Sequence, residues 1–275
     1  ASIAIVENNY GVRNKKKIKL KDSYEFFRKS SQRIRQISNI KSIAVTGSSG
    51  KTSVKELLGN TLKKFTSVTY SKKSYNNKYG VPLSLFNINQ KNIFGVFEVG
   101  MDRKGEIGKL SKLILPDLGV ITNISYAHIK NFKNLTQIAK AKSEIINNIT
   151  CNGSMIINMD DKYYKYFKEK SEKYGLKVNT FSKNNYKADI VYLSKTKYKN
   201  NYQFKFKIKG ILKTFLIPNN LSSYKDNILA SLSIIVNYFD IAKLKKDLFL
   251  GFNIPKSRGS IFNYKKGSKK LTIVD

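Results

Sequence analysis

The sequence predicts an α/β protein with a mostly parallel sheet flanked by helices, a phosphate-binding loop and a small antiparallel sheet region. Between residues 41 and 150, short apolar runs alternate with segments of helical period, which is typical of βαβ units. The apolar run at 42–45 leads directly into the loop Thr46-Gly47-Ser48-Ser49-Gly50-Lys51-Thr52-Ser53. Beyond residue 188, apolar residues alternate with lysines, a pattern that favours antiparallel strands with one solvated face.

The expected elements follow from these periodicities in chain order. In the first 40 residues we expect a strand at 1–6 and a basic amphipathic helix at 23–37, which Asp22 or Ser23 would cap. Later strands are expected at 42–45, 67–70, 94–99, 119–121, 154–158, 189–193, 202–208, 212–217 and 270–275. Later helices are expected at 52–64, 105–114, 135–148, 162–174 and 222–238.

Composition narrows the class of protein. The chain has 275 residues, one cysteine (Cys151) and a formal net charge of +34, so it can form no internal disulfide and a reducing compartment is favoured. Only six of its 52 basic residues are arginines, and the lysines are spread along the chain, which indicates a coding bias and a solvated surface. No apolar run approaches the roughly 20 residues that span a bilayer. We expect a cytoplasmic monomer without nucleic-acid binding or membrane insertion, with a functional basic face as the alternative.

The strongest motif is the loop that follows the strand at 42–45. A strand, a glycine-containing loop and a helix N-terminus together point backbone N–H groups at one spot, where phosphate binds well. Lys51 can place its charge on the β- and γ-phosphates, and the Thr52 hydroxyl can ligate Mg²⁺. The full P-loop pattern has a glycine where Val45 stands, so an ordinary strand-to-helix turn is the alternative. The expected ATP-binding residues of the loop are Gly47, Ser48, Ser49, Gly50, Lys51, Thr52 and Ser53.

Two further candidates stand where apolar strands end. Glu98 closes the run before Gly100, and the carboxyl ends of parallel strands are where ligands gather. A carboxylate there can hold Mg²⁺; the alternative is an acid that caps the next segment. His128, the only histidine in the chain, follows the strand at 119–121. It could be a metal ligand or a structural histidine.

Two motifs remain open from spacing alone. The segment 138–145 carries Lys140 and Lys142; these are either solvated lysines on a surface helix or a lysine that faces the strand ends and takes part in chemistry. Asn76 and Asn77 lie in an Asn/Gly/Pro-rich loop, where two adjacent amides could read a polar substrate or simply form a turn.

Taken together, these motifs resemble the Mur ligase family, ATP-dependent amide-forming enzymes of peptidoglycan synthesis. The resemblance is nearly continuous over residues 41–150. It rests on 46–56, 76–77 with 80–83, 98–101, 105–107, 116–117, 121–124, 127–129 with Phe132, and 138–145. Weaker likenesses follow at 158–161, around Asn227 and at Arg258-Gly259, whereas Asn220-Leu221-Ser222-Ser223 replaces the family's usual Gly-x-His pattern.

The resemblance implies a reaction and a domain arrangement. The reaction joins D-alanyl-D-alanine to UDP-MurNAc-tripeptide through an acyl phosphate made from ATP. Residues 1–40 would end the N-terminal uridine-nucleotide-binding domain and its linker, 41–262 would form the central ATP-binding domain, and 263–275 would begin a truncated C-terminal domain. We therefore expect a fragment of a longer protein that by itself binds ATP weakly and is inactive as a ligase.

The resemblance also implies roles for single residues and two Mg²⁺ sites. Lys51, Glu98, His128 and Lys142 would be catalytic, and Asn227 and Arg258 would contact ATP. Thr52 and Glu98 would hold the first Mg²⁺, His128 and a carbamylated Lys142 would support the second, and Asn76 and Asn77 would contact the substrate. Lys140 competes with Lys142 for the modification.

Three rival functions stay open. One is another ligase of the same fold, such as a folylpolyglutamate synthetase or a different Mur enzyme. Another is a basic P-loop ATPase that acts on nucleic acid, and its mark would be tight, salt-sensitive binding. The last is a nucleotide-binding remnant without catalytic activity.

Overall fold

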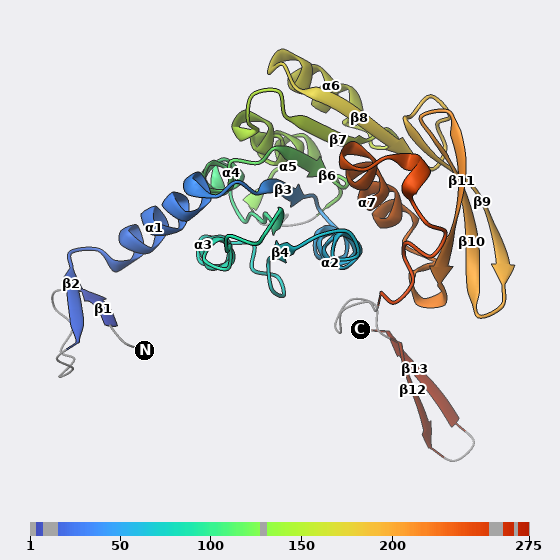
Figure 1. The fold of residues 1–275 in the computed structure, drawn as a ribbon, viewed down its shortest axis with the longest axis horizontal. Helices are drawn as coiled ribbons and strands as arrows, with labels where there is room; N and C mark the ends of the chain where they lie inside the picture. The colour runs from blue at the N-terminus through green and yellow to red at the C-terminus, as the bar shows by residue number, and fades with distance from the viewer. Residues whose placement is uncertain (1–3, 8–15, 127–130, 253–260, 267–268, 275) are drawn as a thin grey trace.

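The computed structural model describes residues 4–7, 16–126, 131–252, 261–266 and 269–274. Its main body is one nine-stranded sheet in the order β11-β10-β9-β8-β7-β6-β3-β5-β4, with helices on both faces (Figure 1). All pairs from β4 to β9 are parallel, and β9, β10 and β11 pair antiparallel. The strands are β3 (Lys41–Thr46), β4 (Val68–Tyr70), β5 (Phe94–Glu98), β6 (Leu118–Ile121), β7 (Ser154–Asn158), β8 (Lys177–Ser182), β9 (Ile190–Tyr198), β10 (Asn201–Ile208) and β11 (Ile211–Pro218).

The central strands are buried on both sides, and their side chains alternate between two cores. On β3, Ile43 and Val45 face one core while Ala44 faces the other, as the two-residue period of a strand requires. Helices α2 (Lys51–Leu62) and α7 (Lys225–Tyr238) cover the first face. The helices over the second face are α3 (Gly80–Leu85), α4 (Glu106–Ile114), α5 (Leu135–Lys142) and α6 (Tyr164–Lys173).

The predicted fold class is confirmed, and most predicted elements are present within a residue or two. The lysine-rich strands do not form a separate sheet: β9 pairs with β8 and so extends the main one. Sequence reasoning missed α3, which it took for a turn, and β8, whose sequence Lys-Val-Asn-Thr-Phe-Ser is half polar. The helix predicted at 135–148 is α5 followed by a 3₁₀ segment, Ser143–Asn148.

Two small sheets lie at the ends of the chain (Figure 1). Near the N-terminus, β1 (Ala4–Glu7) pairs with β2 (Lys17–Leu20), which was not predicted. The strand predicted at 1–6 corresponds to β1, and residues 1–3 lie outside the described residues. Near the C-terminus, β12 (Ile261–Lys266) pairs with β13 (Lys269–Val274); only the second was predicted.

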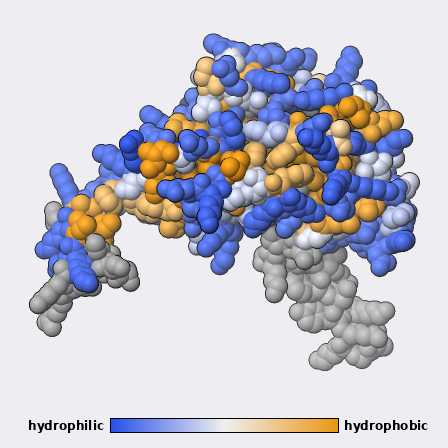
Figure 2. Space-filling view, in the orientation of Figure 1, coloured by the Kyte–Doolittle hydropathy of each residue, from blue (hydrophilic) through white to orange (hydrophobic). Residues whose placement is uncertain are grey.

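The surface agrees with a spread of lysines along the chain. Figure 2 shows hydrophilic side chains spread over the coloured part of the visible face, with apolar areas between them. Among the described residues, no helix is both long enough and apolar enough to cross a bilayer.

Helix α1 (Ser23–Ile37) has the predicted bounds and the predicted cap, because the Asp22 carboxylate accepts the Glu25 N–H at 2.8 Å. One buried guanidinium fastens this helix to the main body. Arg35 donates to the carbonyl oxygens of Ile114 (2.6 Å) and Leu115 (2.8 Å), and it lies 3.4 Å from the Asp117 carboxylate. Because α1 carries residues of a large cavity described below, this anchor also fixes one wall of that cavity.

Replacing Arg35 with methionine should destabilise the protein by about 3 kcal/mol, because the buried acceptors lose a charged donor. The measurement is the free energy of unfolding in urea. Arg33→Met on the same helix is the matched control, since Arg33 is exposed and should change stability by about 0.5 kcal/mol or less. Equal effects of the two variants would contradict the anchoring role.

Candidate active site

The phosphate-loop candidate joins β3 to α2 and is held in place by the segment after β6. Gly47 has φ +149° and Gly50 has φ +80°, backbone conformations that favour glycine. A Cβ on Gly47 would lie 1.8 Å from Thr122 Oγ1, and one on Gly50 would lie 2.7 Å from Asn227 Oδ1. The Thr122 hydroxyl also donates to the Ser49 carbonyl at 2.6 Å. Loop, strand end and α7 therefore meet too closely for any side chain at these two glycines.

Two lysines converge on one carbonyl oxygen of this loop. Lys51 Nζ donates to the Gly47 oxygen at 2.9 Å, and Lys142 Nζ donates to the same oxygen at 2.8 Å from 95 residues along the chain. Burial of Lys142, reinforced by the nearby charge of Lys51, lowers the pKa of its amine to about 7. Lys140 is exposed, so the structure separates the two lysines that spacing alone could not.

Glu98 ends β5 directly beside Val45 of β3 and is 1% exposed. Its Oε1 accepts the Asn76 side-chain N–H at 2.7 Å, whereas its Oε2 is buried without a hydrogen-bond partner. A buried carboxylate oxygen without a donor is costly unless a cation meets it. Within the described residues no three His, Cys, Asp or Glu side chains gather as a metal site, so a Mg²⁺ ion here would depend on Glu98, on the buried Thr52 and on phosphate oxygens.

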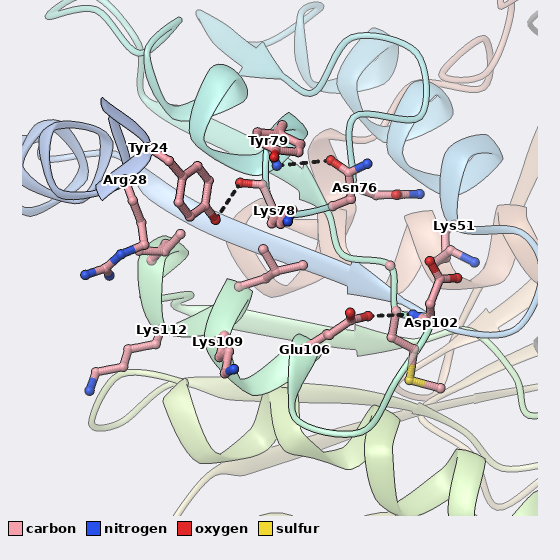
Figure 3. Close-up of a pocket in the computed structure, with 15 residues that line it drawn as sticks. Tyr24, Arg28, Lys51, Asn76, Lys78, Tyr79, Asp102, Glu106, Lys109 and Lys112 are labelled. Carbon is pink, nitrogen blue, oxygen red and sulfur yellow. Dashed lines mark hydrogen bonds between the residues drawn. The ribbon is translucent and has the colours of Figure 1, made fainter. Parts of the chain in front are cut away.

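A cavity of about 760 Å³ opens next to this loop (Figure 3). Its walls come from α1, from the loop before α3 and from α4, and Lys51 reaches it from the phosphate loop. Both predicted asparagines line it, and the Asn77 side-chain oxygen also accepts the N–H of Gly80 at 2.9 Å at the start of α3. The charged and aromatic lining residues are Tyr24, Arg28, Lys51, Lys78, Tyr79, Asp102, Glu106, Lys109 and Lys112.

Sequence reasoning missed the cavity residues on α1 and α4. Tyr24 donates to the Lys78 carbonyl at 3.3 Å and packs edge-on against Tyr79, so α1 closes over the loop before α3. Arg28 also lines the cavity, and Glu25 holds it with two hydrogen bonds of 2.7 Å. The signals in the sequence were the basic amphipathic character of residues 23–37 and the motif at 105–107, to which no site role was given.

A second cavity, of about 310 Å³, lies on the other side of the loop. Ser49, Gly50 and Ser53 line it together with residues 223–227 at the start of α7. The structure thus places Asn227, the predicted adenine contact, against the phosphate loop. His128 and Arg258, the other two predicted site residues, lie outside the described residues.

The helix that carries Lys142 is tied to the cavity wall. The Glu144 carboxylate accepts the N–H groups of Gly105 (2.8 Å) and Gly108 (3.0 Å) at the N-terminus of α4. An acid at that end of a helix satisfies free donors and the helix dipole. Lys170 donates to Ser143 at 3.0 Å and holds the point where α5 becomes a 3₁₀ helix. The position of Lys142 is therefore supported by the contacts of the two residues that follow it, Ser143 and Glu144.

The comparisons with known proteins agree with this arrangement. The family model described as "Mur ligase middle domain" matches residues 45–234, so the chain belongs to the Mur ligase family. Among curated relatives, UDP-N-acetylmuramoyl-tripeptide–D-alanyl-D-alanine ligase of Buchnera aphidicola is 38% identical over 136 residues, which are 50% of this chain and 30% of the relative. The enzyme of that name from Bacillus subtilis is 32% identical over 236 residues, 85% of this chain and 48% of the relative. The matched part of the chain thus spans 30% and 48% of the length of these two relatives.

Solved structures show the same fold. MurF from Acinetobacter baumannii superposes with a TM-score of 0.85 at 23% identity, over 98% of this chain and 58% of that one. MurF ligase from Thermotoga maritima in complex with ADP has a TM-score of 0.81 at 26% identity, over 99% of this chain and 61% of that one. The particular proteins that this chain resembles are therefore the ligases named for UDP-MurNAc-tripeptide and D-alanyl-D-alanine.

The lowered pKa of Lys142 predicts how stability depends on pH. Its amine has a pKa of about 7 in the folded protein against 10.5 in the reference state, so between these values the unfolded chain binds one more proton. The free energy of unfolding of the wild type should therefore rise from pH 7 to pH 10 relative to Lys142→Met. Protonating the buried amine lowers the free energy of unfolding by on the order of a few kcal/mol. This loss is complete below pH 7 and absent above about pH 10.5.

Urea unfolding between pH 6 and pH 10 in CO₂-free buffer measures this dependence. Lys140→Met is the matched control, because Lys140 lies two residues away on the same helix and is exposed. The free energy of unfolding of this variant should change with pH in the same way as that of the wild type. A constant difference between wild type and Lys142→Met across this range would contradict a neutral buried amine.

Proposed function

We propose that this chain is the ATP-binding part of an enzyme that joins D-alanyl-D-alanine to UDP-MurNAc-tripeptide. The observation that carries the proposal is the position of Lys51, which belongs to the phosphate loop and also lines the cavity of about 760 Å³. A phosphate held by this loop would face a ligand in that cavity. The relatives named above and the ADP-bound structure support this reading.

The chemistry needs ATP because a carboxylate is a poor electrophile. In the proposed reaction, a carboxylate oxygen of the tripeptide attacks the γ-phosphorus and ADP leaves. The amine of D-alanyl-D-alanine then attacks the acyl phosphate, forms the amide bond, loses a proton and expels phosphate. The protein's share is positioning and charge neutralisation. Lys51 and the loop amides would bind the phosphates, and the asparagines at 76 and 77 would orient the acceptor.

The residues present also fit the metal that such a reaction uses. Glu98 Oε2 and the Thr52 hydroxyl would hold Mg²⁺, which neutralises charge on the phosphates when bound. The buried Glu98 oxygen without a partner supports this assignment. A second Mg²⁺ with His128 as ligand stays a prediction.

We further propose that Lys142 is carbamylated. A neutral amine is the form that attacks CO₂, and burial keeps much of Lys142 neutral near pH 7. The nitrogen of the neutral amine forms a bond to the carbon of CO₂, one C=O π bond opens onto oxygen, one N–H proton leaves, and the neutral amine becomes an anionic carbamate. That carbamate would lie near the positive charge of Lys51 and could support a metal.

The domain boundaries complete the proposal. Residues 1–40 would end the uridine-nucleotide-binding domain, 41–262 would be the ATP-binding domain and 263–275 would begin the C-terminal domain. Such an enzyme would work as a monomer in the cytoplasm, where ATP is available. The lysines are scattered along the sequence rather than gathered in one segment, which does not favour the nucleic-acid rival.

The first test is phosphate release from ATP by the full-length protein that contains this chain. Release should require both UDP-MurNAc-tripeptide and D-alanyl-D-alanine, and Lys51→Met should lower it at least 100-fold because the phosphates lose their cation. Lys63→Met on the exposed end of the same helix region is the control and should keep full activity. Release that needs neither substrate but responds to DNA or RNA would contradict the proposal.

The second test is a ¹³C NMR spectrum of the protein in ¹³C-bicarbonate at pH 8. A carbamate signal should appear in the wild type and in Lys140→Met, and it should be absent in Lys142→Met. A carbamate signal that survives in Lys142→Met but disappears in Lys140→Met would show that Lys140 is the modified residue. It would overturn the proposed carbamylation of Lys142.

A further inference from the structure

One fully buried lysine has no part in the proposed reaction. Lys55 lies one turn after Lys51 on α2 and has a side-chain exposure of 0%. Burying an ammonium is costly unless all its donors are satisfied. Its Nζ contacts the carbonyl oxygens of Ser71 (2.7 Å) and Lys73 (2.5 Å) and the Glu56 carboxylate (2.7 Å). Two hydrogen bonds and one ion pair therefore surround the buried ammonium group.

Two of these acceptors belong to the segment 71–79, which joins β4 to α3. Lys73 has φ +47°, a left-handed conformation that is unfavourable for a residue with a side chain. Such a backbone persists only where its surroundings hold it. The Lys55 ammonium binds the carbonyl of that same residue, so it holds the segment at its strained point.

The held segment leads to the carboxylate of the candidate metal site. Ser71 accepts the backbone N–H of Glu98 on its hydroxyl at 3.3 Å, and the Asn76 side chain donates to Glu98 Oε1 at 2.7 Å. The Asn76 carbonyl also accepts the Gly100 N–H at 2.8 Å. The segment thus binds both the backbone N–H and the side-chain Oε1 of Glu98. Glu98 Oε2 remains without a hydrogen-bond donor.

We propose that Lys55 is a positioning residue: it holds segment 71–79 so that Asn76 fixes the Glu98 carboxylate with its free oxygen toward the metal of a bound nucleotide. This inference rests on the proposed function, since it assumes that Mg²⁺ and nucleotide bind at Thr52 and Glu98. Lys55 itself touches neither ligand; it acts through the backbone of the segment. The helix that begins at the phosphate loop therefore also sets the geometry of the metal ligand on a neighbouring strand.

The test compares Lys55→Met with Lys64→Met. Lys64, just past the end of α2, also donates to two backbone carbonyls, those of Asp247 (3.1 Å) and Leu250 (2.8 Å), but these lie in a segment without a site residue. The first measurement is hydrogen exchange. Amides of 71–79 should exchange at least tenfold faster in Lys55→Met, and those of Lys64→Met should keep the wild-type rate.

The second measurement is calorimetric titration of ADP with and without Mg²⁺. In Lys55→Met, the affinity for ADP alone should stay within about twofold of wild type, because the phosphate loop is intact. The gain in affinity that Mg²⁺ gives should fall at least fivefold, as it should in Asn76→Ala. A general loss of stability would weaken both affinities together. Lys55→Gln, which keeps an N–H donor, serves the same test if Lys55→Met does not fold.

The outcomes separate the two claims. A wild type that binds ADP neither with nor without Mg²⁺ would contradict the proposed function. A wild type that gains affinity with Mg²⁺, and a Lys55 variant that gains as much, would overturn the role of Lys55 alone. Faster exchange at 71–79 with an unchanged Mg²⁺ effect would overturn it too, because the segment would then not control Glu98.

Discussion

The site depends on the close packing of the phosphate loop against the carboxyl ends of its neighbouring strands. Gly47 can lie against Thr122 only because it has no side chain, and this contact brings the Gly47 carbonyl within reach of Lys142. The amino groups of Lys51 and Lys142 then share one oxygen inside the protein. The charge of Lys51 and burial both disfavour a proton on Lys142, and negative charge from a bound phosphate would offset the charge of Lys51. The geometry of the loop therefore gathers positive charge at the place where an anionic ligand would bind.

The charged residues around the loop come from distant parts of the chain. Each of them lies on a segment that other side chains hold in place. Lys142 is fixed by the contacts of Ser143 and Glu144 that follow it. Glu98 is fixed by the segment before α3. Helix α1 is anchored through a buried guanidinium. A site built in this way keeps its geometry without ligand, which is what preorganised charge stabilisation requires.

Features that depend on neighbouring residues in the sequence were predictable from it. Features that depend on contacts between distant segments were not. The loop between β3 and α2, the parallel strands and the position of Glu98 at a strand end were recognisable because periodicity and strand ends are local signals. Spacing could not separate Lys140 from Lys142, since burial depends on what packs over the helix. The break after α5 was missed because the Ser143 hydroxyl bonds to the Lys140 carbonyl and competes with helix continuation. The cavity residues on α1 and α4 meet only in three dimensions.

The most direct measurement is a crystal structure of this chain with ADP and Mn²⁺, in which anomalous scattering locates the metal. The account predicts phosphates against the loop from Gly47 to Thr52 and manganese on Glu98 Oε2 and the Thr52 hydroxyl. Manganese bound away from Glu98, or a nucleotide held outside the loop, would contradict the central claim that these strand ends form one nucleotide site.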